Sequence, residues 1–214
     1  NLATRTAHAI FLNEHALRPA QQAFATDTYK KHTPDTATKT QFHFGPLDNA
    51  TAKAQGGVGA ICRQPLQLIP ITAKTTAFAK WVQQGRAQLY SLILAPGHTL
   101  YVLPIYAFTG ASEPGNEAIA HQTDDLITDA FVELTAHPEG PAIIPTDLNA
   151  NTQDIHTLQI ALDTHQWHDL GHQAAMWGAT ADQTTCLGYT AKNRTRRDYV
   201  FANAAAKDYI TGIN

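Results

Sequence analysis

The sequence has very few cysteines and no long apolar stretch, and both absences exclude whole classes of protein. Only Cys62 and Cys186 occur among 214 residues. Two cysteines so far apart form neither a disulfide framework nor a paired metal-binding motif, so we expect free thiols. The longest apolar run, residues 89–95, is too short to cross a bilayer. No signal peptide is visible, and the compartment stays open.

Charge is also scarce, which limits how the chain can meet a partner. There are 15 basic and 18 acidic residues, a net charge of −3 with neutral histidines. Bulk charge therefore does not drive binding to nucleic acid, and any contact must come from a local patch. The one dense basic patch contains Arg194, Arg196 and Arg197, which we predict to contact phosphates of a nucleic acid. A solvated loop is the alternative.

Hydrophobic patterning predicts an α+β protein in which strands outnumber helices and the helices cover packed sheets. At 43% apolar residues, the chain can bury the core of one domain or two small ones. Helical spacing predicts helices at residues 18–32, 119–134 and 154–165. Short apolar runs bounded by turn residues predict strands at residues 7–13, 41–44, 58–63, 66–72, 87–94, 100–106, 141–147, 167–170, 184–189 and 197–202.

Two polar residues stand at the end of the strand predicted at residues 141–147. Asp147 closes the apolar run, and Asn149 follows two positions later. Residues i and i+2 at a strand end project to the same side, so a carboxylate and a carboxamide converge there. Such a pair can orient a water molecule, help to hold a divalent cation or donate to a phosphate oxygen. The structural alternative is that Asp147 caps the following helix.

Three histidines, His165, His168 and His172, are spaced by three and four residues. On a continuous helix this spacing makes a metal-binding face. Trp167 and Gly171 interrupt the helical pattern, so we do not assign a metal site to these histidines.

Five motifs in a fixed order resemble the endonuclease/exonuclease/phosphatase superfamily. They are NE at 13–14, GGVGAICR at 56–63, LYVLPIYAFTG at 100–110, PTDLNAN at 145–151 and RTRRDYVFAN at 194–203. The resemblance implies one domain over residues 1–214, folded as a four-layered α/β sandwich of two central, mostly antiparallel sheets flanked by helices. It implies cleavage of phosphodiester or phosphomonoester bonds with Mg²⁺ or Mn²⁺. Thr146 occupies a position that is usually glycine in that superfamily.

The resemblance, carried over position by position, implies a role for each of five residues. Glu14 matches the metal-binding glutamate, and Tyr106 matches a tyrosine that helps to position a phosphate. Asp147 matches the aspartate that orients the attacking water, and Asn149 matches the amide that binds the scissile phosphate. Asp198 matches an aspartate that supports a catalytic histidine. We expect Glu14 and Asp147 to share a hydrated cation site, with Asp198 at least half buried in the same cleft.

Two departures from the superfamily pattern concern catalysis. The superfamily has an asparagine on its first strand, well before the metal-binding glutamate, and too few residues precede Glu14 to match it. It also has a catalytic histidine after the aspartate matched by Asp198, whereas the last histidine here is His172. The chain is therefore expected to be either an excerpt without the first strand and the C-terminal Asp-His segment, or a catalytically inactive relative.

Three functions follow from these residues. The first is a divalent-metal-dependent phosphodiester hydrolase acting on nucleic acid, with an ending that resembles endonuclease domains of retrotransposon reverse transcriptases. The second is an inactive relative that serves as a binding or structural module. The third is a phosphatase acting on a small or lipid phosphate. Because the terminal histidine is unmatched, we expect negligible nuclease activity from residues 1–214 themselves.

Overall fold

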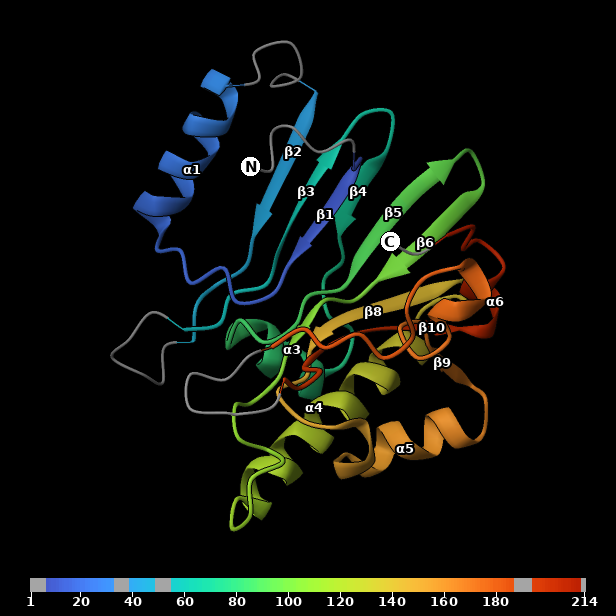
Figure 1. The fold of residues 1–214 in the computed structure, drawn as a ribbon. Coiled ribbons are helices and arrows are strands. Elements are labelled where there is room, and N and C mark those ends of the chain that lie inside the picture. Colours follow the sequence, from blue (N-terminus) through green and yellow to red (C-terminus); the bar gives the residue numbers. More distant parts are fainter. Residues whose placement is uncertain (1–6, 33–38, 49–54, 187–193, 213–214) are drawn as a thin grey trace.

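Two β-sheets pack face to face, and helices cover their outer sides (Figure 1). The computed structural model describes residues 7–32, 39–48, 55–186 and 194–212. The smaller sheet has the strand order β1-β3-β2, and the larger follows the path β4-β5-β6-β8-β10-β9, with β7 beside β8. Most neighbouring strands are antiparallel. The predicted α+β class and the four-layered sandwich are confirmed.

The smaller sheet is built from strands close together in the chain. Its elements are β1 (Ala9–Leu12), α1 (Pro19–His32), β2 (Thr40–Phe44) and β3 (Gly59–Arg63). Helix α1 attaches to the sheet through Tyr29, whose ring meets the Phe42 ring edge-on at 5.1 Å. The Tyr29 hydroxyl also accepts a hydrogen bond from Arg63 Nε at 2.7 Å.

The larger sheet contains the strand that ends at Asp147. Its strands are β4 (Gln67–Pro70), β5 (Tyr90–Ala95), β6 (His98–Val102), β7 (Ile105–Tyr106), β8 (Ala142–Asp147), β9 (Trp167–Asp169) and β10 (Asp198–Asn203). The predicted hairpin is present as β5 and β6. Strands β6 and β7 run parallel to β8, because the chain crosses back through a long helix before β8.

Helices cover the outer face of the larger sheet. They are α3 (Thr76–Gln83), α4 (Glu117–Thr135) and α5 (His156–Asp163), with α6 (Ala204–Lys207) and the short 3-10 helices η2 (Thr152–Asp154) and η3 (Ala174–Trp177) nearby. Leu126, Ile127 and Ala130 of α4 are buried in one core with Ile144 and Phe201. Among the described residues, no helix has both the length and the apolar character that a membrane span requires.

Two segments differ from the sequence-based expectation. Helix α3 was not predicted; Thr75 caps it by accepting a hydrogen bond from Phe78 N. In place of a strand at 184–189 there is a single bridge between Cys186 and Thr195, and residues 187–189 lie outside the described part. Both cysteines are free thiols, as expected.

Glu133 of α4 links two helices through a buried carboxylate. Its side chain is fully buried and accepts hydrogen bonds from Lys74 N at 2.8 Å, Thr75 N at 2.9 Å and Thr75 Oγ1 at 2.8 Å. His137 Nε2 lies 2.9 Å from Glu133 Oε1, the oxygen that also accepts from Lys74 N. Burial alone raises the pKa of Glu133, but these hydrogen bonds outweigh burial and the pKa is lowered.

Replacing Glu133 by alanine is expected to cost about 3 kcal/mol of unfolding free energy, because four donors lose a buried acceptor. Urea unfolding at about pH 7 measures this cost. Asp125→Ala, at an exposed site on the same helix, is the control and should change stability by less than about 0.5 kcal/mol. Because the folded pKa is lowered from 4.5, the stabilisation is present above that pH and is lost as the pH falls below it. Equal losses in the two variants would contradict the prediction.

Candidate active site

Three of the residues singled out from the sequence meet at one end of the larger sheet. In the parallel pairing of β7 with β8, Tyr106 stands opposite Asp147. In the antiparallel pairing of β10 with β8, Asp198 stands opposite Asp147 from the other side. Strand register alone therefore places a tyrosine and two aspartates side by side.

Glu14 reaches the same place from the smaller sheet. It follows β1. Its carboxylate accepts a hydrogen bond from the Tyr106 hydroxyl, and its negative charge raises the pKa of Asp147. The turn that holds it is fixed by His15 N and Ala16 N, which donate to Gly57 O at 2.9 Å and Gly56 O at 3.0 Å. The two sheets thus bring Glu14, Tyr106 and Asp147 together, as the sequence predicted.

Gly57 is needed for the turn that carries Glu14. Its φ is +82°, and a Cβ there would lie 2.4 Å from the His15 ring, closer than real Cβ atoms come. The His15 ring is held in this position, because its Nδ1 accepts a hydrogen bond from Leu17 N at 3.0 Å. The His15 ring therefore packs beside Gly57 and Gly59. Of His15 and Glu14, only Glu14 belongs to the group formed with Tyr106, Asp147 and Asp198, which is called the cluster below.

Two residues of the cluster have a left-handed backbone. Glu14 has φ +55° and Asn149 has φ +53°, a region that residues other than glycine rarely occupy. Such conformations persist only where the surroundings impose them, and they gather at functional sites. For Glu14, whose side chain has no local hydrogen bond that favours this region, the strain is an independent sign of function.

The electrostatics of the cluster favour a bound cation. Burial raises the pKa of Asp147 to about 6, with further increases from the charges of Asp198 and Glu14, while Asn149 opposes the shift. Burial also raises the pKa of Tyr106 to about 12, helped by the hydrogen bond to Glu14. Both pKa shifts arise from burial together with nearby negative charge, and a bound divalent cation would offset that charge.

Three residues in the candidate site or next to it in the chain have a buried polar atom that makes no well-aligned hydrogen bond, namely Asn149 Nδ2, Asn13 Oδ1 and Arg197 Nη1. The Asn149 side chain nevertheless lies near enough to the Asp147 carboxylate to oppose the rise of its pKa. An unpaired buried donor or acceptor is costly and calls for a ligand. Two of these atoms are donors suited to phosphate oxygens.

The donor set suits Mg²⁺ or Mn²⁺ held through one or two carboxylates and several waters. In the described part of the chain, no three His, Cys, Asp or Glu side chains form a ready-made ligand set. A fully coordinated zinc-type site, which needs three or four protein ligands, is therefore not formed here, and the interrupted histidine series does not make one either. His172 instead pairs with Asp182 at 2.8 Å.

Arg86 packs against Tyr106 of the cluster, and the sequence analysis did not single it out. It is buried, pairs with Asp48 at 2.8 Å and donates to Ala107 O at 3.2 Å. Its guanidinium lies 4.9 Å from the Tyr106 ring centre and 4.3 Å from that of Phe108. It therefore fixes the Tyr106 ring. The partners lie far apart in the sequence, and no local pattern reveals them.

Asp198 and Arg196 differ from expectation. Asp198 stands beside Asp147 on β10 and is solvent-exposed, so it does not fit the interpretation of a buried, hydrogen-bonded acid. Arg196 is held by Asp169 at 2.5 and 2.8 Å and by Asp182 at 3.0 Å, and lies over the Tyr199 ring. Its guanidinium is thus engaged within the protein, whereas Arg194 is exposed and Arg197 keeps an unpaired nitrogen.

Several solved structures share this fold. The Xenopus laevis APE2 catalytic domain superimposes with a TM-score of 0.64 at 14% identity, covering 95% of this chain and 76% of that one. Humanized D. rerio TDP2 gives 0.62 at 17%, covering 95% and 73%. The 3′ phosphatase NExo from Neisseria, bound to a product DNA hairpin, gives 0.61 at 15%, covering 95% and 79%.

These identities show a shared fold and nothing more. No protein-family model matches the chain, and no curated protein matches it by sequence.

Proposed function

We propose that the cluster around Asp147 is the active site of a divalent-metal-dependent phosphodiester hydrolase of the endonuclease type, with nucleic acid as substrate. The observation that carries the proposal is the meeting of Glu14, Tyr106 and Asp147 from two sheets beside the unpaired amide of Asn149. Structural neighbours were solved with DNA, namely D. rerio TDP2 with a single-strand DNA product and NExo with a product hairpin. The narrower kinship with retrotransposon endonucleases is supported by sequence motifs only.

Each residue has a distinct task in this proposal. Glu14, with Asp147 or Asp198 through water, would hold Mg²⁺ or Mn²⁺, which would polarise the phosphate and offset its charge. Asp147 accepts a hydrogen bond from the attacking water and orients it. Asn149 donates Nδ2–H to a non-bridging phosphate oxygen. Tyr106, fixed by Arg86 and bonded to Glu14, holds the carboxylate in place and lines the phosphate position.

The proposal is tested by hydrolysis of bis(p-nitrophenyl) phosphate in Mg²⁺ or Mn²⁺. Asn149→Gly keeps the left-handed backbone accessible and removes only the amide. We expect the metal-dependent rate to fall by about 10- to 100-fold, the worth of one hydrogen bond to a charged group. Asn151→Gly is the matched control, because Asn151 Nδ2 is already bonded to Asp154 at 2.9 Å. A rate unaffected by Asn149→Gly would refute the role of the amide, and no metal-dependent rate in any form would refute the function.

Arg194 and Arg197 are expected to contact the phosphates of single-stranded DNA, whereas Arg196 is not. Each of Arg194→Ala and Arg197→Ala should weaken binding and reduce the slope of log affinity against log salt by about 0.7. Arg196→Ala should instead lower the unfolding temperature, because it removes the ion-pair partner of the largely buried Asp169 carboxylate. Fluorescence anisotropy over a salt series, with thermal unfolding of each variant, separates the two effects. Equal salt slopes in all variants would contradict the assignment.

A further inference from the structure

Asn149 stands between two fully buried residues. Leu148 and Ala150 are both 0% exposed and belong to the core shared with helix α4. The backbone of Asn149 has φ +53°, a conformation that residues other than glycine hold only where their surroundings impose it. The cause therefore lies in the contacts that the backbone makes on either side of Asn149.

Three hydrogen bonds hold the backbone on the two sides of Asn149. They run from Leu148 N to Arg197 O at 2.8 Å, from the Tyr199 hydroxyl to Ala150 O at 3.3 Å, and from Asn151 N to Ser112 Oγ at 2.8 Å. The first joins backbone to backbone. The other two depend on the hydroxyl groups of Ser112 and Tyr199, so a substitution can remove each of them without changing the path of the chain.

Ser112 is itself held in place by the loop between β7 and α4. Within this loop, Gly110 O accepts hydrogen bonds from Glu113 N at 3.0 Å and from Asn116 Nδ2 at 3.1 Å. Ala111, the residue before Ser112, is 5% exposed and packs in the core shared with α4. The loop is therefore closed by its own bonds and attached to the core, which makes the Ser112 hydroxyl a fixed acceptor.

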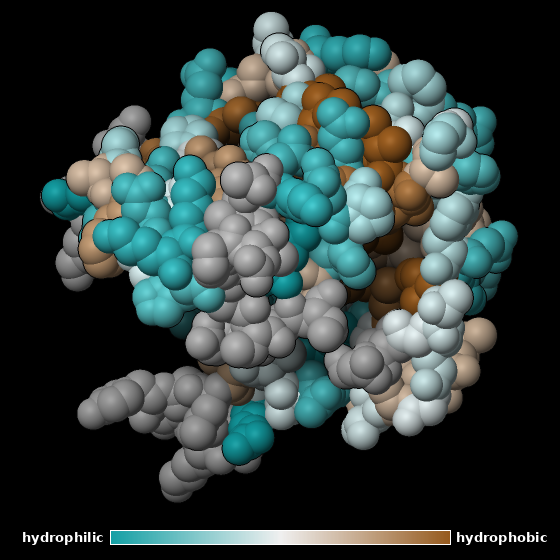
Figure 2. Space-filling model, turned by 90° about the horizontal axis from the view of Figure 1, so that it is seen from above, coloured by the Kyte–Doolittle hydropathy of each residue, from teal (hydrophilic) through white to brown (hydrophobic). Residues whose placement is uncertain are grey.

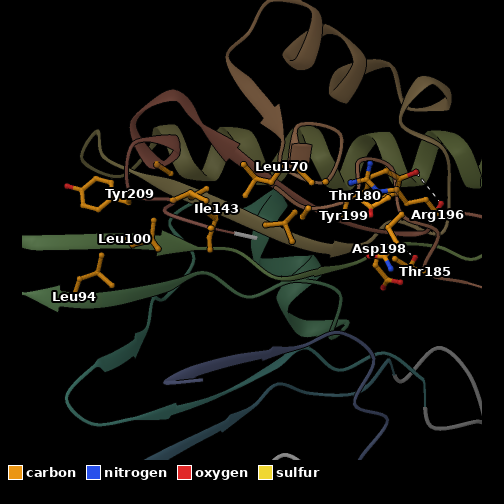
Figure 3. Close-up of a pocket in the computed structure, with 18 residues that line it drawn as sticks. Leu94, Leu100, Ile143, Leu170, Thr180, Thr185, Arg196, Asp198, Tyr199 and Tyr209 are labelled. Carbon is orange, nitrogen blue, oxygen red and sulfur yellow. Dashed lines mark hydrogen bonds between the residues drawn. The ribbon is translucent and has the colours of Figure 1, made fainter. Parts of the chain in front are cut away.

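Tyr199 is held by two neighbouring side chains. Its ring is nearly parallel to that of Phe201, with centroids 5.6 Å apart, and the Arg196 guanidinium lies 4.3 Å from its centre (Figure 3). Its hydroxyl lies 3.3 Å from Ala150 O and 3.2 Å from Arg196 O, so two carbonyls share one proton. Burial raises the pKa of Tyr199, and the hydroxyl therefore stays a donor. Val200 faces the other side of the sheet, where hydrophobic residues gather in a hollow (Figure 2).

We propose that Ser112 and Tyr199 are positioning residues, whose hydroxyl groups hold Asn149 in its left-handed conformation and so direct its amide to the phosphate. Each hydroxyl acts through the backbone of a residue next to Asn149 and not on the reacting atoms. Groups that act through one residue are not additive with the loss of that residue. The task of the amide rests on the proposed function, whereas the hold on the backbone does not.

The hold on the backbone is tested by NMR without any catalysis. The one-bond coupling between Cα and Hα of Asn149 differs between left-handed and other backbone conformations. It should have the left-handed value in the parent and shift away from it in Ser112→Ala/Tyr199→Phe and, to a smaller extent, in Ser112→Ala alone. Ser91→Ala/Tyr90→Phe, which removes a serine and a tyrosine hydroxyl from β5, is the matched control and should keep the parent value. An unchanged coupling in both Ser112 variants, or an equal shift in the control, would overturn the proposal.

The consequence for the site is tested with inorganic phosphate binding in Mg²⁺ and with hydrolysis of bis(p-nitrophenyl) phosphate. Ser112→Ala should weaken binding and lower the rate by about tenfold in the parent. In Asn149→Gly the same change should have less than about a twofold effect, because no amide is left to position. A merely structural role would give equal effects in the two backgrounds, and that result would overturn the positioning role.

The two proposals fail in different ways. If Asn149→Gly lowers the rate and Ser112→Ala does not, the positioning role is wrong and the proposed function stands. If no form of the protein hydrolyses the diester, the proposed function is wrong, and the coupling at Asn149 still decides whether Ser112 and Tyr199 hold the backbone.

Discussion

Asp147→Asn is expected to make the metal-free protein more stable at about pH 8 and at the same time to remove hydrolysis of bis(p-nitrophenyl) phosphate. The pKa of Asp147 is raised from 3.8 to about 6 by burial and by the charges of Asp198 and Glu14. Above both values the folded protein therefore carries a penalty of about 2 kcal/mol, which asparagine lacks. The rate should fall by at least about 100-fold, because the group that orients the water is lost.

The sign of the pH dependence identifies the cause. A raised folded pKa means that the penalty is absent below about pH 4, grows as the pH rises from 3.8 to about 6, and is constant above. Urea unfolding in EDTA should thus show the advantage of the variant at about pH 8 and not at about pH 4. Mg²⁺ should reduce the advantage, since a cation offsets the clustered charge.

Asp163→Asn, at an exposed position on α5, is the control and should leave stability and rate within error. The competing interpretation of Asp147 as a helix cap predicts no such gain, because asparagine caps a helix about as well as aspartate does. A variant that is no more stable than the parent at about pH 8 would therefore contradict the raised pKa and the clustered charge on which the functional interpretation rests.

The fold could be read from local patterns wherever one face of an element is apolar. The spacing of Leu126, Ile127 and Ala130 predicted α4, and the run before Asp147 predicted β8, because both bury these residues in the same core. Helix α3 was missed because its position depends on Glu133, which binds Lys74 N and Thr75 N from 58 or more residues away. A bond of that kind leaves no local signal.

The residues of the proposed site could be named from the sequence, but the residues that support them could not. Strand-end polar residues such as Glu14, Tyr106 and Asp147 are recognisable in sequence, whereas the register that joins them is set by packing. The burial of Asp198 was misjudged for a similar reason. Tyr199 and Phe201 point into the core, so Asp198 and Val200 point to the opposite face, and that face is left uncovered by the narrower sheet. Because Val200 is apolar, the sequence suggested that this face is buried, but no described strand covers it.

Plasmid DNA is expected to be nicked by this polypeptide at least about 10²-fold more slowly than by the same site with a general acid, even where the polypeptide hydrolyses the activated diester. Both reactions use Glu14, Asp147 and Asn149 for the phosphate and the water. They differ in the leaving oxygen, because p-nitrophenolate leaves unprotonated, whereas a sugar oxygen needs a general acid worth about 10²- to 10⁴-fold. The Tyr106 hydroxyl is a poor acid, with a pKa raised to about 12 by burial and Glu14.

No described histidine is placed to supply this proton. His15 is turned against Gly57, and His172 is paired with Asp182 in a different cavity from the cluster. The assay compares bis(p-nitrophenyl) phosphate hydrolysis with plasmid nicking in Mg²⁺ and in Mn²⁺, and Asp147→Ala serves as the contamination control in both. Fast nicking that disappears in Asp147→Ala would show that a group within these residues, with His15 the first to replace by asparagine, protonates the leaving oxygen.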